Sequence, residues 1–347
     1  MRQGVGFLLR MIVALSLLVG TAGCALAQDV DRFAVTEMDD ADTLTATQRL
    51  FPQIGPGLRA VKRDAAGHYY VLASPAPGLT VFDAAGKTLL QLSSAVQTGI
   101  PARVKPPILF GEDCDVDAAG RIYVADRGAG AVKIFSPTGE LLRTIPVAMP
   151  ISLASMSGGE IAVSTLRGPH LVTVFDLNGR EVREFGNPAD IAEREDLNRF
   201  LNIGRLARDA RDHLYYAFDY LPEPTVREFD RQGYSKTEIQ VTTLDVLPKA
   251  QAIRREIQRQ EKRGDSPSFK RVLTAVGVDP VTGEVWIALE NTLFHFDREG
   301  NRRSAYRLYT PEGARLEATS ILIEAERLLI GSDPLGVYEF ARPDKPR

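Results

Sequence analysis

Along most of the chain, short apolar stretches alternate with polar turns that are rich in Asp and Gly. Within the stretches, apolar and polar residues alternate with a period of two, and Val, Ile, Tyr and Phe are frequent, as in β-strands with one buried face. Asp and Gly allow the tight reversals and positive φ angles of turns between antiparallel strands. The pattern therefore predicts many short antiparallel strands joined by tight turns.

One unit recurs six times: a strand closes with Phe, and in five copies a polar turn ending in Gly follows. The turn before the preceding strand is also shared, as at 117–120 before the apolar residues 122–124. The Phe residues lie 40 to 67 positions apart. The shorter spacings match the length of about 40–45 residues of a four-stranded propeller blade, and the longer ones indicate insertions. The six positions are Phe82, Phe135, Phe175, Phe229, Phe296 and Phe340.

A single four-stranded sheet of this kind cannot bury both of its faces, whereas sheets arranged radially bury them against each other. We therefore predict an all-β fold, a six-bladed β-propeller over residues 28–347. If the strands of each blade are lettered a to d from the axis outward, the sixth copy ends after strand c. We expect the N-terminal segment, either 31–38 or 43–50, to supply strand d, since such closure removes an open sheet edge.

The copy at 117–139 resembles an NHL repeat, most closely in the run Asp-Ala-Ala-Gly-Arg-Ile-Tyr-Val-Ala-Asp-Arg-Gly at 117–128. The other copies are more degenerate, but together they cover nearly the whole chain after residue 28. The resemblance implies a six-bladed propeller. It implies no single activity, because NHL-like and related propellers include binding scaffolds, lyases and lactonases.

The N-terminus has the layout of a signal peptide, residues 1–27: two arginines flank a short apolar run at 11–19, and small residues follow. Cleavage after Ala27 would release the chain into the periplasm or the medium. The alternative is lipidation, because 21–24 resembles a bacterial lipobox and would anchor the protein through Cys24. No later segment is apolar enough to span a membrane, so we expect no transmembrane segment in the mature chain.

Two insertions, at about 187–204 and 247–264, interrupt the repeats, and both have helical spacing of apolar residues. Asn187 and Pro188 suit the N-cap and first position of the first helix. Both insertions connect strand d of one blade to strand a of the next, and such loops emerge on the same face as the b–c loops. We expect both helices on that face, covering part of the central opening, either as a lid or docking platform or as insertions packed against the rim.

The second insertion is basic, with eight Lys and Arg against three Asp and Glu between 248 and 271. Arg254, Arg255 and Arg259 could attract an anionic small molecule, an acidic glycan or an acidic protein partner. Alternatively, they form a solvated helix face. We predict no binding of nucleic acid, because the net charge of the chain is −3 and no wider basic surface is evident.

The b–c loops carry most of the polar candidates on the shared face. Asp126, Asp219 and Glu290 follow the b strands at nearly equivalent positions, as does Asp333. A ring of carboxylates could bind Ca²⁺ through oxygen ligands or supply general acids and bases; alternatively, the Asp residues belong to the repeat and accept hydrogen bonds from nearby backbone. The four His residues are too scattered for a transition-metal site. The other loop candidates are Arg127, Arg167, Tyr220 and Asn291.

These features favour a non-enzymatic binding or scaffolding propeller in the cell envelope, whose partner is a protein or an anionic small molecule or glycan. The alternative is a hydrolase, lactonase or lyase with a central, oxygen-ligated divalent cation. The two hypotheses differ in geometry. Convergence of Asp126, Asp219 and Glu290 at the axis would favour the enzyme, whereas side chains that turn back to the backbone would favour the binding module.

Overall fold

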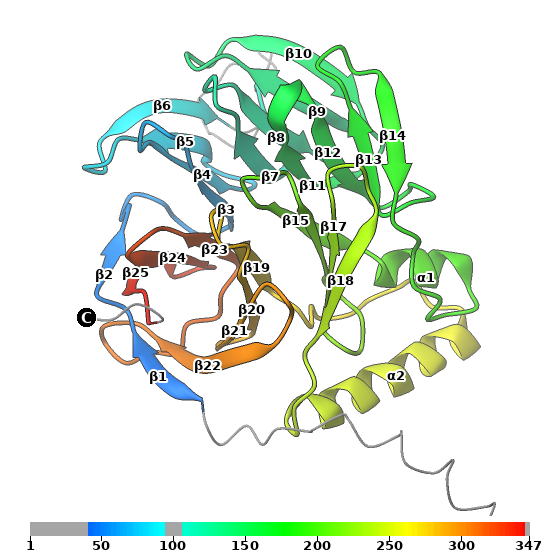
Figure 1. Ribbon diagram of the computed structural model, residues 1–347. Helices are drawn as coiled ribbons and strands as arrows, with labels where there is room; N and C mark the ends of the chain where they lie inside the picture. The colour runs from blue at the N-terminus through cyan, green and yellow to red at the C-terminus, as the bar shows by residue number, and fades with distance from the viewer. Residues whose placement is uncertain (1–40, 94–105, 344–347) are drawn as a thin grey trace, which may run out of the picture. The chain divides into compact units, whose positions relative to one another are not determined.

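The computed structural model describes residues 41–93 and 106–343, and these form a six-bladed β-propeller (Figure 1). The predicted fold class is confirmed. Contacts between neighbouring inner strands run from blade to blade and close the ring, with strand order β3, β7, β11, β15, β19, β23. The predicted signal peptide, the lipobox and the segment 31–38 lie outside the described residues.

The first four blades follow chain order from the axis outward. Blade 1 comprises β3 (Leu58–Arg63), β4 (Tyr69–Ala73), β5 (Gly78–Phe82) and β6 (Thr88–Ser93). Blade 2 comprises β7 (Gly111–Val116), β8 (Ile122–Asp126), β9 (Ala131–Phe135) and β10 (Leu141–Pro146). Blade 3 comprises β11 (Pro150–Ser155), β12 (Ile161–Thr165), β13 (Val172–Phe175) and β14 (Glu181–Phe185), with a 3-10 turn, η2 (Ser157–Gly159), after β11. Blade 4 comprises β15 (Gly204–Arg208), β16 (Leu214–Phe218), β17 (Thr225–Phe229) and β18 (Ser235–Gln240).

The last two blades contain strands from the N-terminal segment. Blade 5 comprises β19 (Ala275–Val278), β20 (Val285–Leu289), β21 (Thr292–Phe296) and β22 (Arg302–Tyr309), and β1 (Asp42–Thr45) adds to β22 in parallel. Blade 6 comprises β23 (Ser320–Ile323), β24 (Arg327–Ser332) and β25 (Gly336–Ala341), and β2 (Gln48–Leu50) pairs antiparallel with β25 as its outer strand. The predicted N-terminal closure is thus confirmed within 43–50, whereas the extra strand β1 was not predicted.

The repeated residues have clear structural roles. Each repeated Phe lies in strand c, and five of the six are fully buried between blades, Phe175 being half-buried. The turn carboxylates accept hydrogen bonds from the backbone that follows: Asp117 Oδ1 accepts from the N–H groups of Ala119 and Arg121, both at 2.9 Å. Gly120 has a φ of 75°, which favours glycine. The repeat therefore encodes blade packing and turn geometry.

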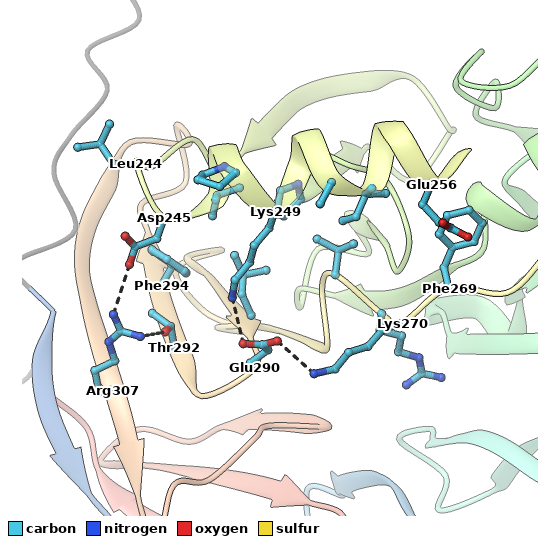
Figure 2. A pocket seen from close by; sticks show the side chains of 18 of the residues that line it. Leu244, Asp245, Lys249, Glu256, Phe269, Lys270, Glu290, Thr292, Phe294 and Arg307 are labelled. Carbon is cyan, nitrogen blue, oxygen red and sulfur yellow. Dashed lines mark hydrogen bonds and ion pairs between the residues drawn. The ribbon is translucent and has the colours of Figure 1, made fainter. Parts of the chain in front are cut away.

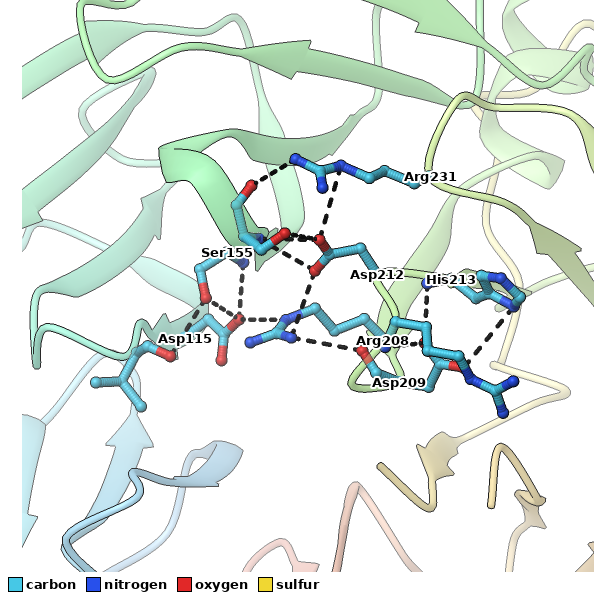
Figure 3. A network of polar contacts seen from close by, with 10 residues as sticks. Asp115, Ser155, Arg208, Asp209, Asp212, His213 and Arg231 are labelled. Atoms are coloured by element: carbon cyan, nitrogen blue, oxygen red, sulfur yellow. Dashed lines mark hydrogen bonds and ion pairs between the residues drawn. The ribbon is translucent and has the colours of Figure 1, made fainter. Parts of the chain in front are cut away.

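Polar contacts join the inner strands of blades 2, 3 and 4 (Figure 3). The backbone N–H and the hydroxyl of Ser155 both donate to Asp115 Oδ2, each at 2.8 Å. Arg208 lies 3.9 Å from the same carboxylate and 3.7 Å from that of Asp212. Cys114 is free and buried beside this network, and burial raises its pKa, as expected for a thiol in the core.

The first helical insertion begins later than predicted. Helix α1 spans Glu195–Leu201, so the assignment of Asn187 as N-cap and Pro188 as first helical residue is wrong. Side chains of the helix instead hold the preceding loop in a non-helical conformation. Asn198 Oδ1 accepts from the N–H groups of Ile191 and Ala192, at 2.9 and 3.1 Å.

The second insertion forms α2 (Val246–Arg263), and Gly264 ends it with a φ of 69°. The two helices contact each other, since Leu197 and Leu201 of α1 form one buried cluster with Ile257 of α2. Tyr220, from the b–c loop of blade 4, packs against the same cluster, which confirms that both helices lie on the b–c face. Within the described ranges, no helix is long and apolar enough to cross a membrane.

The helices do not cover the central opening as expected. Asp245, directly before α2, lies 3.6 Å from Arg307 of the outer strand β22, so the start of α2 is held over the outer part of blade 5. Figure 1 likewise places α1 and α2 beside the outer parts of blades 4 and 5, away from the inner strands. The ion pair with β22 and the packing of both helices with Tyr220 hold them there, which a helical pattern alone does not reveal.

Candidate functional site

Charged residues from four blades gather at the axis on the b–c face. Each inner strand begins on this face, and the second residue of three of them is charged: Arg59 in β3, Glu112 in β7 and Arg205 in β15. Two further arginines come from loops, Arg127 after β8 and Arg271 before β19. We call Arg59, Arg127, Arg205 and Arg271, together with Glu112 and Asp219, the arginine cluster.

The cluster is contiguous, and Glu112 and Asp219 link its cations. Arg127 Nε lies 2.8 Å from Glu112 Oε1, and Arg59 Nη1 lies 4.0 Å from Glu112 Oε2. Arg205 joins the two halves: its Nη1 donates to the backbone carbonyl of Glu112 at 3.5 Å, and its Nε lies 3.6 Å from Asp219 Oδ2. Arg271 Nε lies 3.2 Å from that same oxygen.

Four guanidinium groups face two carboxylates, so the cluster carries an excess of positive charge. Burial lowers the pKa of Arg59; the nearby charges of Arg205 and Arg271 add to this shift, whereas Glu112 and, more weakly, Asp333 oppose it. Burial raises the pKa of Asp219 against the opposing effect of Arg205 and Arg271. Buried polar atoms of the cluster also remain without a hydrogen-bond partner among the described residues: the donors Nε of Arg59 and Nε and Nη2 of Arg205, and both carboxylate oxygens of Asp219. Such an arrangement favours an added anion.

Asp126, the first of the predicted carboxylate ligands, turns away from the axis. Its side chain is fully buried and accepts hydrogen bonds from the N–H groups of Leu109 and Phe110, both at 2.9 Å. Lys133 Nζ lies 2.7 Å from its Oδ2. The interpretation in which this Asp belongs to the repeat and binds backbone is the one that the structure supports.

The other three carboxylates also have separate partners. Asp219 lies between arginines, Glu290 accepts from Lys249 at 3.0 Å and Lys270 at 3.1 Å, and Asp333 accepts from the N–H of Gly57 at 2.7 Å. Across 41–93 and 106–343, no three His, Cys, Asp or Glu side chains gather in a way that could hold a metal ion. The proposed carboxylate ring, and with it Ca²⁺ on Asp126, Asp219 and Glu290, does not fit this arrangement.

The remaining predicted residues are dispersed over the b–c face. Tyr220 packs against Phe200 of α1 with the rings tilted by 36° and 4.6 Å between ring centroids, and it lies near Arg271. Arg254 pairs with Glu223 at 2.7 Å, and Arg259 pairs with Glu256. These pairs agree with the interpretation of the basic helix as a solvated face. Arg167 and Arg255 are exposed, and Asn291 is half-buried.

A central cavity, of about 760 Å³, opens on the opposite, a–b face among the ends of the inner strands. Its cations are largely matched by carboxylates. Arg342 pairs with Asp279 at 2.6 Å, and Arg63 lies 3.4 Å from Glu324. This cavity therefore lacks the positive excess of the arginine cluster, which is the better candidate for ligand binding.

Comparison with solved structures supports the propeller fold. A gluconolactonase from Xanthomonas campestris aligns with a TM-score of 0.54 at 16% identity, over 88% of this chain and 96% of that one. A streptogramin B lyase aligns with a TM-score of 0.51 at 14% identity, over 86% and 87% of the two chains. A virginiamycin B lyase from Staphylococcus aureus aligns with a TM-score of 0.50 at 11% identity, over 86% and 88%.

These likenesses show the fold alone. At such low identity they transfer no activity to this chain. The sequence matches no family model and no curated protein, so membership of the NHL-repeat family stays a prediction.

Proposed function

We propose that this chain is an exported binding propeller that recognises an anionic ligand at the arginine cluster. The observation that carries the proposal is the meeting of four guanidinium groups at the axis with two carboxylates, Glu112 and Asp219, within 4.0 Å of them among the described residues. The apolar N-terminal run, followed by small residues, supports export to the periplasm or medium. Mass spectrometry of the mature N-terminus would distinguish cleavage after Ala27 from lipidation of Cys24.

The chemistry of the cluster favours a ligand with several acidic oxygens. A guanidinium group presents donors in a planar fork that matches carboxylate and phosphate groups. Arg59 and Arg205 both contact Glu112, the first at its carboxylate and the second at its backbone carbonyl, and each carries buried donor atoms without a hydrogen-bond partner among the described residues. A di- or tricarboxylate, a phosphate-bearing small molecule or an acidic glycan would satisfy them.

Substitution of Arg271 tests this proposal, because this side chain is partly exposed and its loss should leave the fold intact. We expect Arg271→Gln to weaken binding of trigalacturonate, citrate or inorganic phosphate about tenfold, a loss of about 1.4 kcal/mol, measured by isothermal titration calorimetry. The wild-type affinity should also fall as the salt concentration rises.

The matched control is Arg255→Gln, which removes an exposed arginine of α2 remote from the cluster. Its affinity should equal that of the wild type, and neutral galactotriose should not bind. Absence of binding by all three anions, or equal losses in both variants, would contradict the proposal.

A second candidate is an enzyme that acts on an anionic substrate through Asp219. The observation that favours it is a buried carboxyl group whose pKa burial raises, beside two arginines, as is common for general acids and bases. Turnover of sugar-acid lactones by the purified protein would support it, provided that Asp219→Asn removes turnover while trigalacturonate still binds. If the wild type binds these anions but turns over no lactone, the enzyme is excluded and the binding function proposed first remains.

A further inference from the structure

A further pocket lies between α2, the segment 268–272 and the outer part of blade 5 (Figure 2). Its volume is about 800 Å³, within the range of about 300–1,000 Å³ usual for small-molecule sites. Most of its walls are apolar. They include Val246, Ala252, Ile253, Phe269, Leu289 and Phe294.

Two lysines reach one carboxylate at the side of this pocket. Lys249 from α2 and Lys270 from the following loop donate to opposite oxygens of Glu290, at 3.0 and 3.1 Å (Figure 2). Lys249 and, secondarily, Lys270 lower the pKa of Glu290, and Glu290 raises that of Lys270. Among the described residues, Glu290 is the only carboxylate within 4.0 Å of either ammonium group, and Glu317 acts on Lys270 from farther away, so one positive charge remains without a directly paired counter-ion at this point.

The remaining charges of the pocket are matched within it. Asp245 lies 3.6 Å from Arg307, which also donates to Thr292 Oγ1 at 3.0 Å. Glu256 pairs with Arg259 of the same helix. Arg271 also borders the pocket, but its nearest carboxylate is Asp219 in the arginine cluster. The uncompensated charge of the pocket is therefore located at Lys249 and Lys270.

We propose that this pocket binds an amphipathic anion, with its apolar body against the walls and a single carboxylate at Lys249 and Lys270. Transfer of an alkyl chain from water to such walls contributes about 0.8 kcal/mol for each CH₂ group buried. A carboxylate at the lysines would provide the missing counter-ion. This ligand class differs from that of the arginine cluster, where four guanidinium groups favour a ligand with several acidic oxygens.

Calorimetric titration with dodecanoate, below its critical micelle concentration, tests the proposal. Dodecanol, which lacks the carboxylate, and hexanoate, which has a shorter chain, are the comparison ligands. We expect dodecanoate to bind with 1:1 stoichiometry and hexanoate at least tenfold more weakly, because hexanoate buries fewer CH₂ groups. Ala252→Trp fills the pocket from the exposed face of α2 and should abolish binding. The control Gln258→Trp places the same ring on α2 outside the pocket lining and should leave affinity unchanged.

The headgroup contact is tested by the double variant Lys249→Gln/Lys270→Gln. It should weaken dodecanoate binding about tenfold and leave dodecanol binding unchanged, whereas the control Lys262→Gln, at an exposed position outside the pocket, should change neither. Sedimentation velocity without ligand would show whether a second copy of the chain occupies the pocket instead.

Three results would each overturn the proposal. Dodecanoate does not bind the wild type, Ala252→Trp and Gln258→Trp lose dodecanoate affinity equally, or the wild type is a dimer that Ala252→Trp dissociates. Arg127→Gln, which alters the arginine cluster alone, should not affect dodecanoate. The two proposed sites can therefore fail independently.

Discussion

Deletion of the chain through Leu50 is expected to lower the midpoint of thermal unfolding by about 10 °C or more, or to prevent folding altogether. This deletion removes β2, so blade 6 is left with three strands and an open edge on β25. It also removes Ala46, which is buried in the core of blades 5 and 6, and the backbone hydrogen bond from Thr47 N–H to the carbonyl of Glu339. Calorimetry or circular dichroism would measure the change.

Deletion through Thr45 is the matched comparison, because it removes β1 and keeps β2. The strand β1 pairs in parallel with β22, in a blade that already has four strands of its own. We therefore expect the midpoint of thermal unfolding to fall clearly less than after deletion through Leu50. A chain that begins at Ala41 is the reference for both. Equal midpoints for the two deletions would show that closure of blade 6 does not hold the ring together.

The fold was predictable because its determinants are local and repeated. A buried Phe at the end of strand c and a carboxylate in the turn recur in successive blades, so each copy strengthens the others. Strand β1 lacks such a signal: its residues are mostly exposed, and the sequence Asp-Thr-Leu-Thr has one apolar position. The start of α1 was missed for a related reason, because Asn198 binds the backbone of the preceding loop across several residues.

The candidate site was less predictable, because its residues come from the inner strands as well as the loops. Arg127 and Asp219 follow b strands and were identified, but Arg59 and Arg205 were not. Their signal was present: each is a charged residue at the second position of an inner strand, followed directly by two apolar residues. That they meet at the axis depends on the closed ring, in which blades 1 and 4 lie across the axis from each other, and spacing along the chain does not show this.

Asp126→Asn is expected to destabilise the protein by about 3 kcal/mol or more at neutral pH. The substitution breaks a buried ion pair and leaves the ammonium group of Lys133 without its counter-ion, and loss of one partner of such a pair typically costs about 3–5 kcal/mol. Asp333→Asn is the matched control, since this carboxylate is exposed and accepts one backbone hydrogen bond. Asp333→Asn should lower the free energy of unfolding by about 1 kcal/mol. Urea unfolding of the three proteins would measure both differences.

The pH dependence of this difference tests the assigned role of Asp126. Although burial opposes its charge, Lys133 and the N–H groups of Phe110 and Leu109 lower the pKa of Asp126 below its usual value. A carboxylate with a lowered folded-state pKa stabilises the protein above the unfolded-state value of about 3.9 and loses that contribution as the pH falls through the folded-state pKa. The difference in the free energy of unfolding between the wild type and Asp126→Asn should therefore be largest at neutral pH and become smaller below about pH 4. If Asp126 were instead a Ca²⁺ ligand, added Ca²⁺ would raise the unfolding midpoint of the wild type and not that of the variant. A carboxylate that binds backbone requires two results. The unfolding midpoint of the wild type should be the same with and without Ca²⁺, and its stability difference from Asp126→Asn should become smaller at low pH.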